Sequence, residues 1–201
     1  MAENTVKLDD PYQVPAAELT ETSAADRTTL FVVSKKKMIL LFMFTFGMYS
    51  LVWFYENWKR IKMDTGSSIW PAPRAVFSIF FAHSLFKHIH KSASDAGEQV
   101  SWSYTAMAAA YIVMSILGHV AERMSDLAGA LSLLLLPMIL YVLWKVQASA
   151  NVSQSDPQGT SNSRFTIANY VWSILGLLLW ALVIIGLADI LGLVSFDEMA
   201  Y

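Results

Sequence analysis

The sequence predicts an all-α integral membrane protein. Of its 201 residues, 55% are hydrophobic and 15% are charged, and the mean hydropathy is +0.44. Soluble globular domains are usually about 45–50% apolar and about 25% charged. The charges are also clustered, because acidic residues crowd the first 26 positions while long stretches downstream carry none. A charge at the centre of a bilayer is costly, so charges in membrane proteins gather at the ends of the spans.

Composition also excludes several classes of function. The chain has no cysteine, which rules out disulfides, thiol catalysis and metal sites with cysteine ligands. Its formal net charge of -2 gives no overall basic field, so we expect no nucleic-acid partner. The polar, acidic opening from Met1 to Asn4 is unlike a cleavable signal peptide.

The N-terminal part divides into a tail and two interrupted apolar segments. Residues 1–34 are acidic, contain proline and lack apolar periodicity, so we expect a disordered cytoplasmic tail; the helical membrane domain is predicted over residues 35–201. The apolar segment 38–55 is just long enough to span, but Thr45 and Gly47 suit a helix break within it. The segment 75–86 is shorter than a span. Both segments are therefore expected to be re-entrant, interfacial or spanning.

Three further segments predict firm transmembrane helices, at about residues 102–120, 127–144 and 169–193. The first two are separated by a short turn, which makes them an antiparallel hairpin. Pro137 is expected to kink the second helix without breaking the span.

The distribution of Lys and Arg favours re-entrant segments. If all five apolar segments spanned with the N-terminus inside, nine basic residues would lie inside and five outside. If the first two segments enter and return to the same face, thirteen lie inside and only Arg123 lies outside. Because cytoplasmic loops are enriched in Lys and Arg, we expect the second arrangement, with a cytoplasmic N-terminus.

Four short motifs stand out within about residues 31–91: Thr45–Tyr49, Trp53–Lys59, Asp64–Gly66 and Pro73–Ala75. They resemble the motifs of a family of small uncharacterised inner-membrane proteins of bacteria, whose members typically read T-L-G-L-Y, Y-W-F-Y-K-N-W, R-T-G and P-F-W-R-A. The chain departs from the pattern at Phe46, at Glu56 and at Ala72–Pro73. The resemblance implies a multi-pass protein of the bacterial inner membrane and no particular mechanism.

The candidate site residues fall into three groups. Lipid-headgroup or structural roles are expected for a basic and aromatic set: Trp58, Lys59, Arg60, Lys62 and Arg74. Thr45 and Gly47 are the helix-break candidates. Asp189, about one turn from the outer end of the last helix, is either a coupling acid within the membrane or an interfacial residue.

The function expected first is non-enzymatic: a scaffold, or a factor that protects the membrane or a protein complex. The alternatives are a small transporter or channel subunit with Asp189 as the coupling acid, and an immunity protein against a membrane-acting toxin. No catalytic residue, metal ligand or cofactor is predicted. The expected partners are membrane lipids and either another membrane protein or a second copy of the chain.

Overall fold

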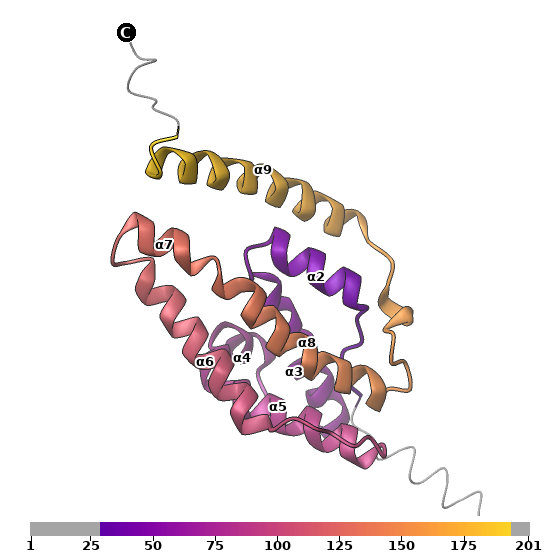
Figure 1. Cartoon of the computed structure of the whole chain (residues 1–201). Coiled ribbons are helices and arrows are strands. Elements are labelled where there is room, and N and C mark those ends of the chain that lie inside the picture. The colour runs from indigo at the N-terminus through magenta and orange to yellow at the C-terminus, as the bar shows by residue number, and fades with distance from the viewer. Residues whose placement is uncertain (1–28, 194–201) are drawn as a thin grey trace, which may run out of the picture.

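The structure, a computed structural model, describes residues 29–193, and its regular elements there are all helical (Figure 1). They are α2 (Lys35–Phe44), α3 (Tyr49–Thr65), α4 (Pro71–Val76), α5 (Ser78–Asp95), α6 (Tyr104–Ala121), α7 (Asp126–Ser132), α8 (Leu135–Ser153), a short 3-10 helix (Thr160–Asn162) and α9 (Ile167–Ile190). The predicted all-α fold is confirmed.

Three stretches within residues 29–193 are long and apolar enough to cross a membrane: α6, α7 together with α8, and α9. Their bounds match the predicted spans to within a few residues, except that α8 continues to Ser153 instead of ending near residue 144. The reason is that the last turns of α8 are buried in the protein, where Gln147 and Asn151 are fully covered. Apolar composition alone therefore marks the membrane part of this helix and not its end.

The second span is interrupted at Leu133 and Leu134, between α7 and α8. Pro137 has no N–H to donate to the carbonyl of Leu133, and its ring crowds that carbonyl. The Leu133 carbonyl instead accepts from the N–H of Leu136 at 3.1 Å, a tighter turn than an α-helix makes. The predicted effect of Pro137 thus takes the form of a break one turn before the proline.

The first apolar segment forms a hairpin, α2–α3, whose two ends lie together. At its entry, the Nζ of Lys37 donates to the carbonyl of Arg164 at 2.8 Å, just before α9 begins. At its exit, Asp64 accepts hydrogen bonds from the backbone N–H and the hydroxyl of Thr29, which precedes α2. The chain therefore enters the helix bundle and returns to the same end of it.

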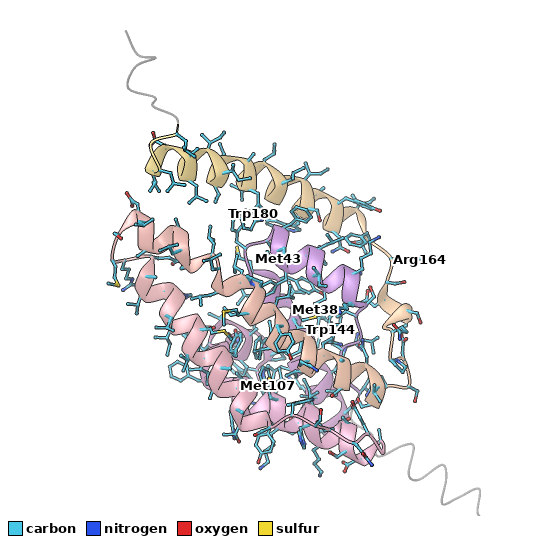
Figure 2. All side chains as sticks on the ribbon, in the orientation of Figure 1. Met38, Met43, Met107, Trp144, Arg164 and Trp180 are labelled. Carbon is cyan, nitrogen blue, oxygen red and sulfur yellow. The ribbon has the colours of Figure 1, made fainter. Side chains whose placement is uncertain are left out.

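The hairpin reaches about the middle of α9. A side chain at Gly176 would collide with the carbonyl of Phe44, since an added Cβ would lie 1.8 Å from that oxygen. One turn further on, the indole N–H of Trp180 donates to the carbonyl of Met43 at 2.9 Å, and Figure 2 shows Trp180 on the side of α9 that faces α2. Both contacts lie near the centre of the 24-residue helix α9.

The second apolar segment is another hairpin, α4–α5, with its turn at Phe77. Ser78, at the start of α5, is bonded to the hydroxyl of Tyr111, halfway along α6, at 2.9 Å. Beyond the far end of α5, Glu98 accepts from Ser149 of α8 at 3.4 Å. This hairpin also reaches the middle of the bundle and returns, and α5 is longer than the segment 75–86 that its apolar residues predicted.

Residues 29–34 differ from the expected tail, because they form an extended segment that is largely buried. Three amide side chains with no exposed surface, Asn57, Gln147 and Asn151, hold its backbone. Asn151 both donates to the Val33 carbonyl (3.0 Å) and accepts from its N–H (3.3 Å), while Gln147 donates to the Phe31 carbonyl (2.7 Å) and Asn57 accepts from the Phe31 N–H (3.2 Å). Residues 1–28 of the predicted tail lie outside the described residues.

Candidate functional site

A cavity of about 450 Å³ lies where the helices of the bundle are interrupted. One wall is the turn between α2 and α3, at Phe46–Met48. A second is the turn between α4 and α5, at Val76 and Ser78, and a third is the break between α7 and α8, at Leu133. Helix α6 closes the remaining side. Its size falls within the usual range for small-molecule sites, roughly 300–1,000 Å³.

Polar side chains run along this cavity, which we term the polar cavity. At its inner end the buried hydroxyls of Ser78 and Tyr111 are bonded to each other, with Ser50 beside them. At its outer end lie the exposed side chains of His119 and Glu122. Tyr111 and Glu122 are eleven residues apart on α6, about 16 Å at 1.5 Å per residue. The cavity therefore runs from the middle of the bundle to the end that carries the α6–α7 turn.

The helix ends around the polar cavity present both signs of the helix dipole. Three helices end beside it (α2, α4 and α7), and three begin beside it (α3, α5 and α8). Helix N-termini favour negative groups and C-termini favour positive ones. Irregular backbone at membrane depth is tolerated where it is buried in protein or lines a wet cavity. Helix N-termini and C-termini around the polar cavity can therefore interact with negative and positive groups of the same small solute.

The α2–α3 turn is built so that its backbone is satisfied. The hydroxyl of Thr45 donates to the carbonyl of Leu41 (2.7 Å) and accepts from the N–H of Tyr49 (2.9 Å), so one side chain caps both helices. The N–H of Gly47 returns to the carbonyl of Phe42 at 2.8 Å, and that of Phe46 to the carbonyl of Met43 at 3.3 Å. This is the Schellman pattern for ending a helix, with positive φ at Phe46 (51°) and Gly47 (82°).

A layer of packed aromatic rings closes the inner end of the polar cavity. Phe54 lies 5.4 Å from Tyr111 and 6.4 Å from Phe86, while Trp53 lies 5.1 Å from Phe54, between ring centroids. Trp53, Phe54 and Phe86 have no exposed surface. On the far side of this layer, the indole N–H of Trp53 donates to Gln147, one of the amides that hold residues 29–34. The polar cavity is therefore separated from the buried amides by apolar rings.

The predicted basic residues are not among those that line the polar cavity. Lys59 lies over the ring of Tyr55 and Lys62 is exposed. Arg60 is half-buried, with its Nη1 donating to the carbonyl of Leu30 at 3.4 Å. Arg74 lies over the buried ring of Trp58, 4.4 Å from the ring centroid.

The remaining candidates divide between the cavity and the lipid-facing surface. Gly47 lines the polar cavity, and Thr45 supports the turn beside it. Asp189 is exposed on α9 and is not among the residues that line the polar cavity. The structure does not bring Asp189 together with Thr45 and Gly47, as a coupling acid at the helix break would require.

Several residues of the site were missed from the sequence. Ser50, Ser78, Tyr111 and Ser115 are polar residues in or beside apolar runs, which is a readable signal for a polar site within a membrane. The amides of α8 also form a pattern that can be seen in the sequence. Gln147 and Asn151 are one helical turn apart, so they lie on the same face of the helix. Their partners are more than 90 residues away in the chain, and no local pattern identifies them.

Comparison with known proteins gives no match to a protein-family model, to a curated protein or to a solved structure. The expected membership of the inner-membrane family therefore stays a prediction.

Proposed function

We propose that this chain is a non-enzymatic transport protein, or the solute-binding subunit of one, which takes a small polar solute into the polar cavity. The observation that carries the proposal is the convergence of three helix interruptions on one cavity whose mostly apolar lining includes several polar side chains. Transporters commonly bind substrate at discontinuous helices near the bilayer midplane.

The chemistry of the lining favours a neutral or zwitterionic solute. Hydroxyls at Ser50, Ser78 and Tyr111 can each donate or accept, and none of the Lys and Arg residues between positions 29 and 193 lines the cavity. Glu122 lies at the outer end, where it can pair with an ammonium or hydroxyl group of the solute. Entry from that end is open, and the aromatic layer blocks passage inward in this conformation.

The location we propose is the inner membrane of a bacterium, with the polar cavity open to the non-cytoplasmic side. Three spans support a multi-pass protein. Lys and Arg support the orientation, since the α6–α7 turn carries only Arg123 while most other basic residues lie at the opposite end.

The absence of native cysteine allows a direct test of cavity access. Ser115→Cys places a single thiol in the lining of the polar cavity, and Ile116→Cys places one at the same depth on the lipid-facing side of α6. A charged, membrane-impermeant thiosulfonate reagent is added to intact spheroplasts. We expect Ser115→Cys to react readily and Ile116→Cys to stay unmodified, because the reagent is excluded from hydrocarbon.

The solute is then identified by finding which compounds protect the thiol of Ser115→Cys from the reagent. A panel of amino acids and polyols is tested for slowing the reaction of Ser115→Cys, and a protecting solute is used for uptake into proteoliposomes. Equal reaction of the two thiols, or failure of every solute in the panel to protect or to enter, would count against the proposal.

A scaffold is the second candidate, favoured by the exposure of α9. Only Gly176 on that helix is buried, and most of its large apolar side chains are exposed. A helix of this kind lies in lipid or against another membrane protein. Co-purification of a stoichiometric membrane partner that is lost on substitution of α9 surface residues would favour this function over transport.

A further inference from the structure

Among residues 29–193, Arg74 has no anionic partner, and its guanidinium lies on aromatic rings. Its guanidinium carbon lies 4.4 Å from the centroid of the Trp58 ring and 5.0 Å from that of Phe81. Within residues 29–193, no side chain or carbonyl accepts a hydrogen bond from this guanidinium, and no carboxylate pairs with it. The rings occupy its faces, so its N–H groups remain free at the edges.

The surroundings of Arg74 add positive charge. His88 lies next to it, with its ring 6.0 Å from that of Trp58. Partial burial, and then the charges of Arg74, Lys91 and Lys87, lower the pKa of His88. Three cations therefore act on one small region of α4 and α5. The indole N–H of Trp58 is also buried without an acceptor among the described residues.

Trp58, the ring beneath Arg74, lies about half the thickness of a hydrocarbon core from the α2–α3 turn, measured along α3. The α2–α3 turn lies at the middle of α9, and Trp58 lies nine residues beyond Tyr49, about 13 Å further along α3. Half of a bilayer's hydrocarbon core is about 15 Å. Large apolar side chains flank Arg74 and are strongly exposed: Trp70 (73%), Val76 (65%), Phe77 (56%) and Phe80 (80%). They suit contact with acyl chains beside a bound headgroup.

We propose that Arg74, with Lys87, His88 and Lys91 around it, forms a binding site for a phosphate group at the cytoplasmic face of the membrane. The planar guanidinium binds two phosphate oxygens side by side, and the ring of Trp58 fixes its plane. The phosphate belongs either to a phospholipid headgroup of the inner leaflet or to a soluble phosphorylated compound. This site is independent of the polar cavity.

The test is a titration of the purified full chain in a neutral detergent, read by native mass spectrometry. The probes are phosphatidylglycerol, diacylglycerol with the same acyl chains, and glycerol 3-phosphate. The variants are Arg74→Gln and a matched control, Lys36→Gln, which removes one exposed positive charge at the start of α2. We expect Arg74→Gln to weaken phosphatidylglycerol binding about tenfold and Lys36→Gln to leave it nearly unchanged.

The source of the phosphate follows from the other probes. Binding of phosphatidylglycerol without competition by glycerol 3-phosphate identifies the lipid headgroup, whereas Arg74-dependent binding of glycerol 3-phosphate identifies a soluble compound; both outcomes support the site. Equal affinity for diacylglycerol, or the same affinity in Arg74→Gln and Lys36→Gln, overturns it. If Arg74→Gln does not give a monodisperse protein, Arg74→Lys replaces it. That variant keeps the charge but loses the planar fork, so several-fold weaker binding is expected and unchanged binding overturns the proposal.

Discussion

Gly176 is the residue on which the contact between α9 and the α2–α3 turn depends. An added Cβ would lie 1.8 Å from the carbonyl oxygen of Phe44, and a backbone atom has little room to move. We therefore predict that Gly176→Ala separates α9 from α2 and destabilises the protein by about 1–3 kcal/mol, the usual cost of overpacking. Thermal unfolding in detergent measures the loss.

The matched control is Gly186→Ala on the same helix, where an added Cβ meets nothing within 4 Å. Alanine is the better helix former, so this variant should be neutral or slightly more stable. Equal melting temperatures for the two variants would mean that α9 does not pack on the turn as described.

Asn151 is the residue that fixes the extended segment before α2. Its amide makes both hydrogen bonds to Val33 and accepts a third from Gln147 at 2.7 Å. Asn151→Ala leaves these buried groups unpaired, and each unpaired group costs about 1–3 kcal/mol. We predict strong destabilisation and faster proteolysis of the chain near residue 33, measured by limited digestion.

Ser94→Ala is the comparison for Asn151→Ala, because the hydroxyl of Ser94 is exposed and bonds only to its own helix at His90. This variant should resist digestion like the parent protein. Indistinguishable digestion of Asn151→Ala and the parent would refute the role given to the amide.

Among the elements, the loop between α8 and α9 owes its shape to one carboxylate. Asp156 accepts hydrogen bonds from the N–H groups of Ser161 (2.8 Å) and Thr160 (2.9 Å), and the Ser161 bonds, followed by those of Thr160, lower its pKa to about 2. The folded pKa is below 3.8, the ordinary value for an aspartate, so this stabilisation is complete above about pH 4 and is lost as the pH falls toward 2.

The loop rests on the extended segment, since an added Cβ at Gly159 would lie 2.4 Å from the backbone of Val33. A fluorophore attached at Ser163→Cys should therefore report a loosening between pH 4 and pH 2. Adding Asp156→Ala should give the loosened signal already at neutral pH and remove this transition. A transition unchanged by Asp156→Ala would assign it to another group.

The break between α7 and α8 is predicted to depend on Pro137. Pro137→Ala restores an N–H that can bond to the carbonyl of Leu133, so we expect α7 and α8 to become one continuous helix. The wall formed by Ser132 and Leu133 would then change shape. A thiol at Ser132→Cys should lose much of its reactivity toward a charged reagent in the Pro137→Ala background. Unchanged reactivity would show that neighbouring helices impose the break.

Helices and turns could be predicted from the sequence where neighbouring residues in the chain determine them. Thr45 and Gly47 mark a real turn because a hydroxyl cap and a positive φ are local needs, and the three spans follow from length and apolarity. The end of α8 and the extended segment 29–34 were not predictable. They depend on amides of α3 and α8 meeting backbone groups far away in the chain.

At the scale of the whole molecule, the α2–α3 and α4–α5 hairpins determine where the polar cavity lies. Both reach the middle of the bundle, where their turns meet the α7–α8 break around the polar cavity. Both return to the end where Thr29, Asp64 and Glu98 lie. The cavity could not be read from the sequence, because it exists only where three separated interruptions come together. The side of the membrane on which the basic residues lie stays a prediction, made by counting Lys and Arg on each side of the spans.

The central claim is that the α2–α3 segment enters the membrane and returns to the cytoplasmic side. Single cysteines at Lys62 and Arg123 test it most directly in a chain without native cysteine, using an impermeant maleimide on intact spheroplasts. We predict that position 123 is labelled at once and position 62 only after the membrane is permeabilised. Labelling of both positions in intact spheroplasts would mean that the first segment crosses the membrane, and would contradict the account.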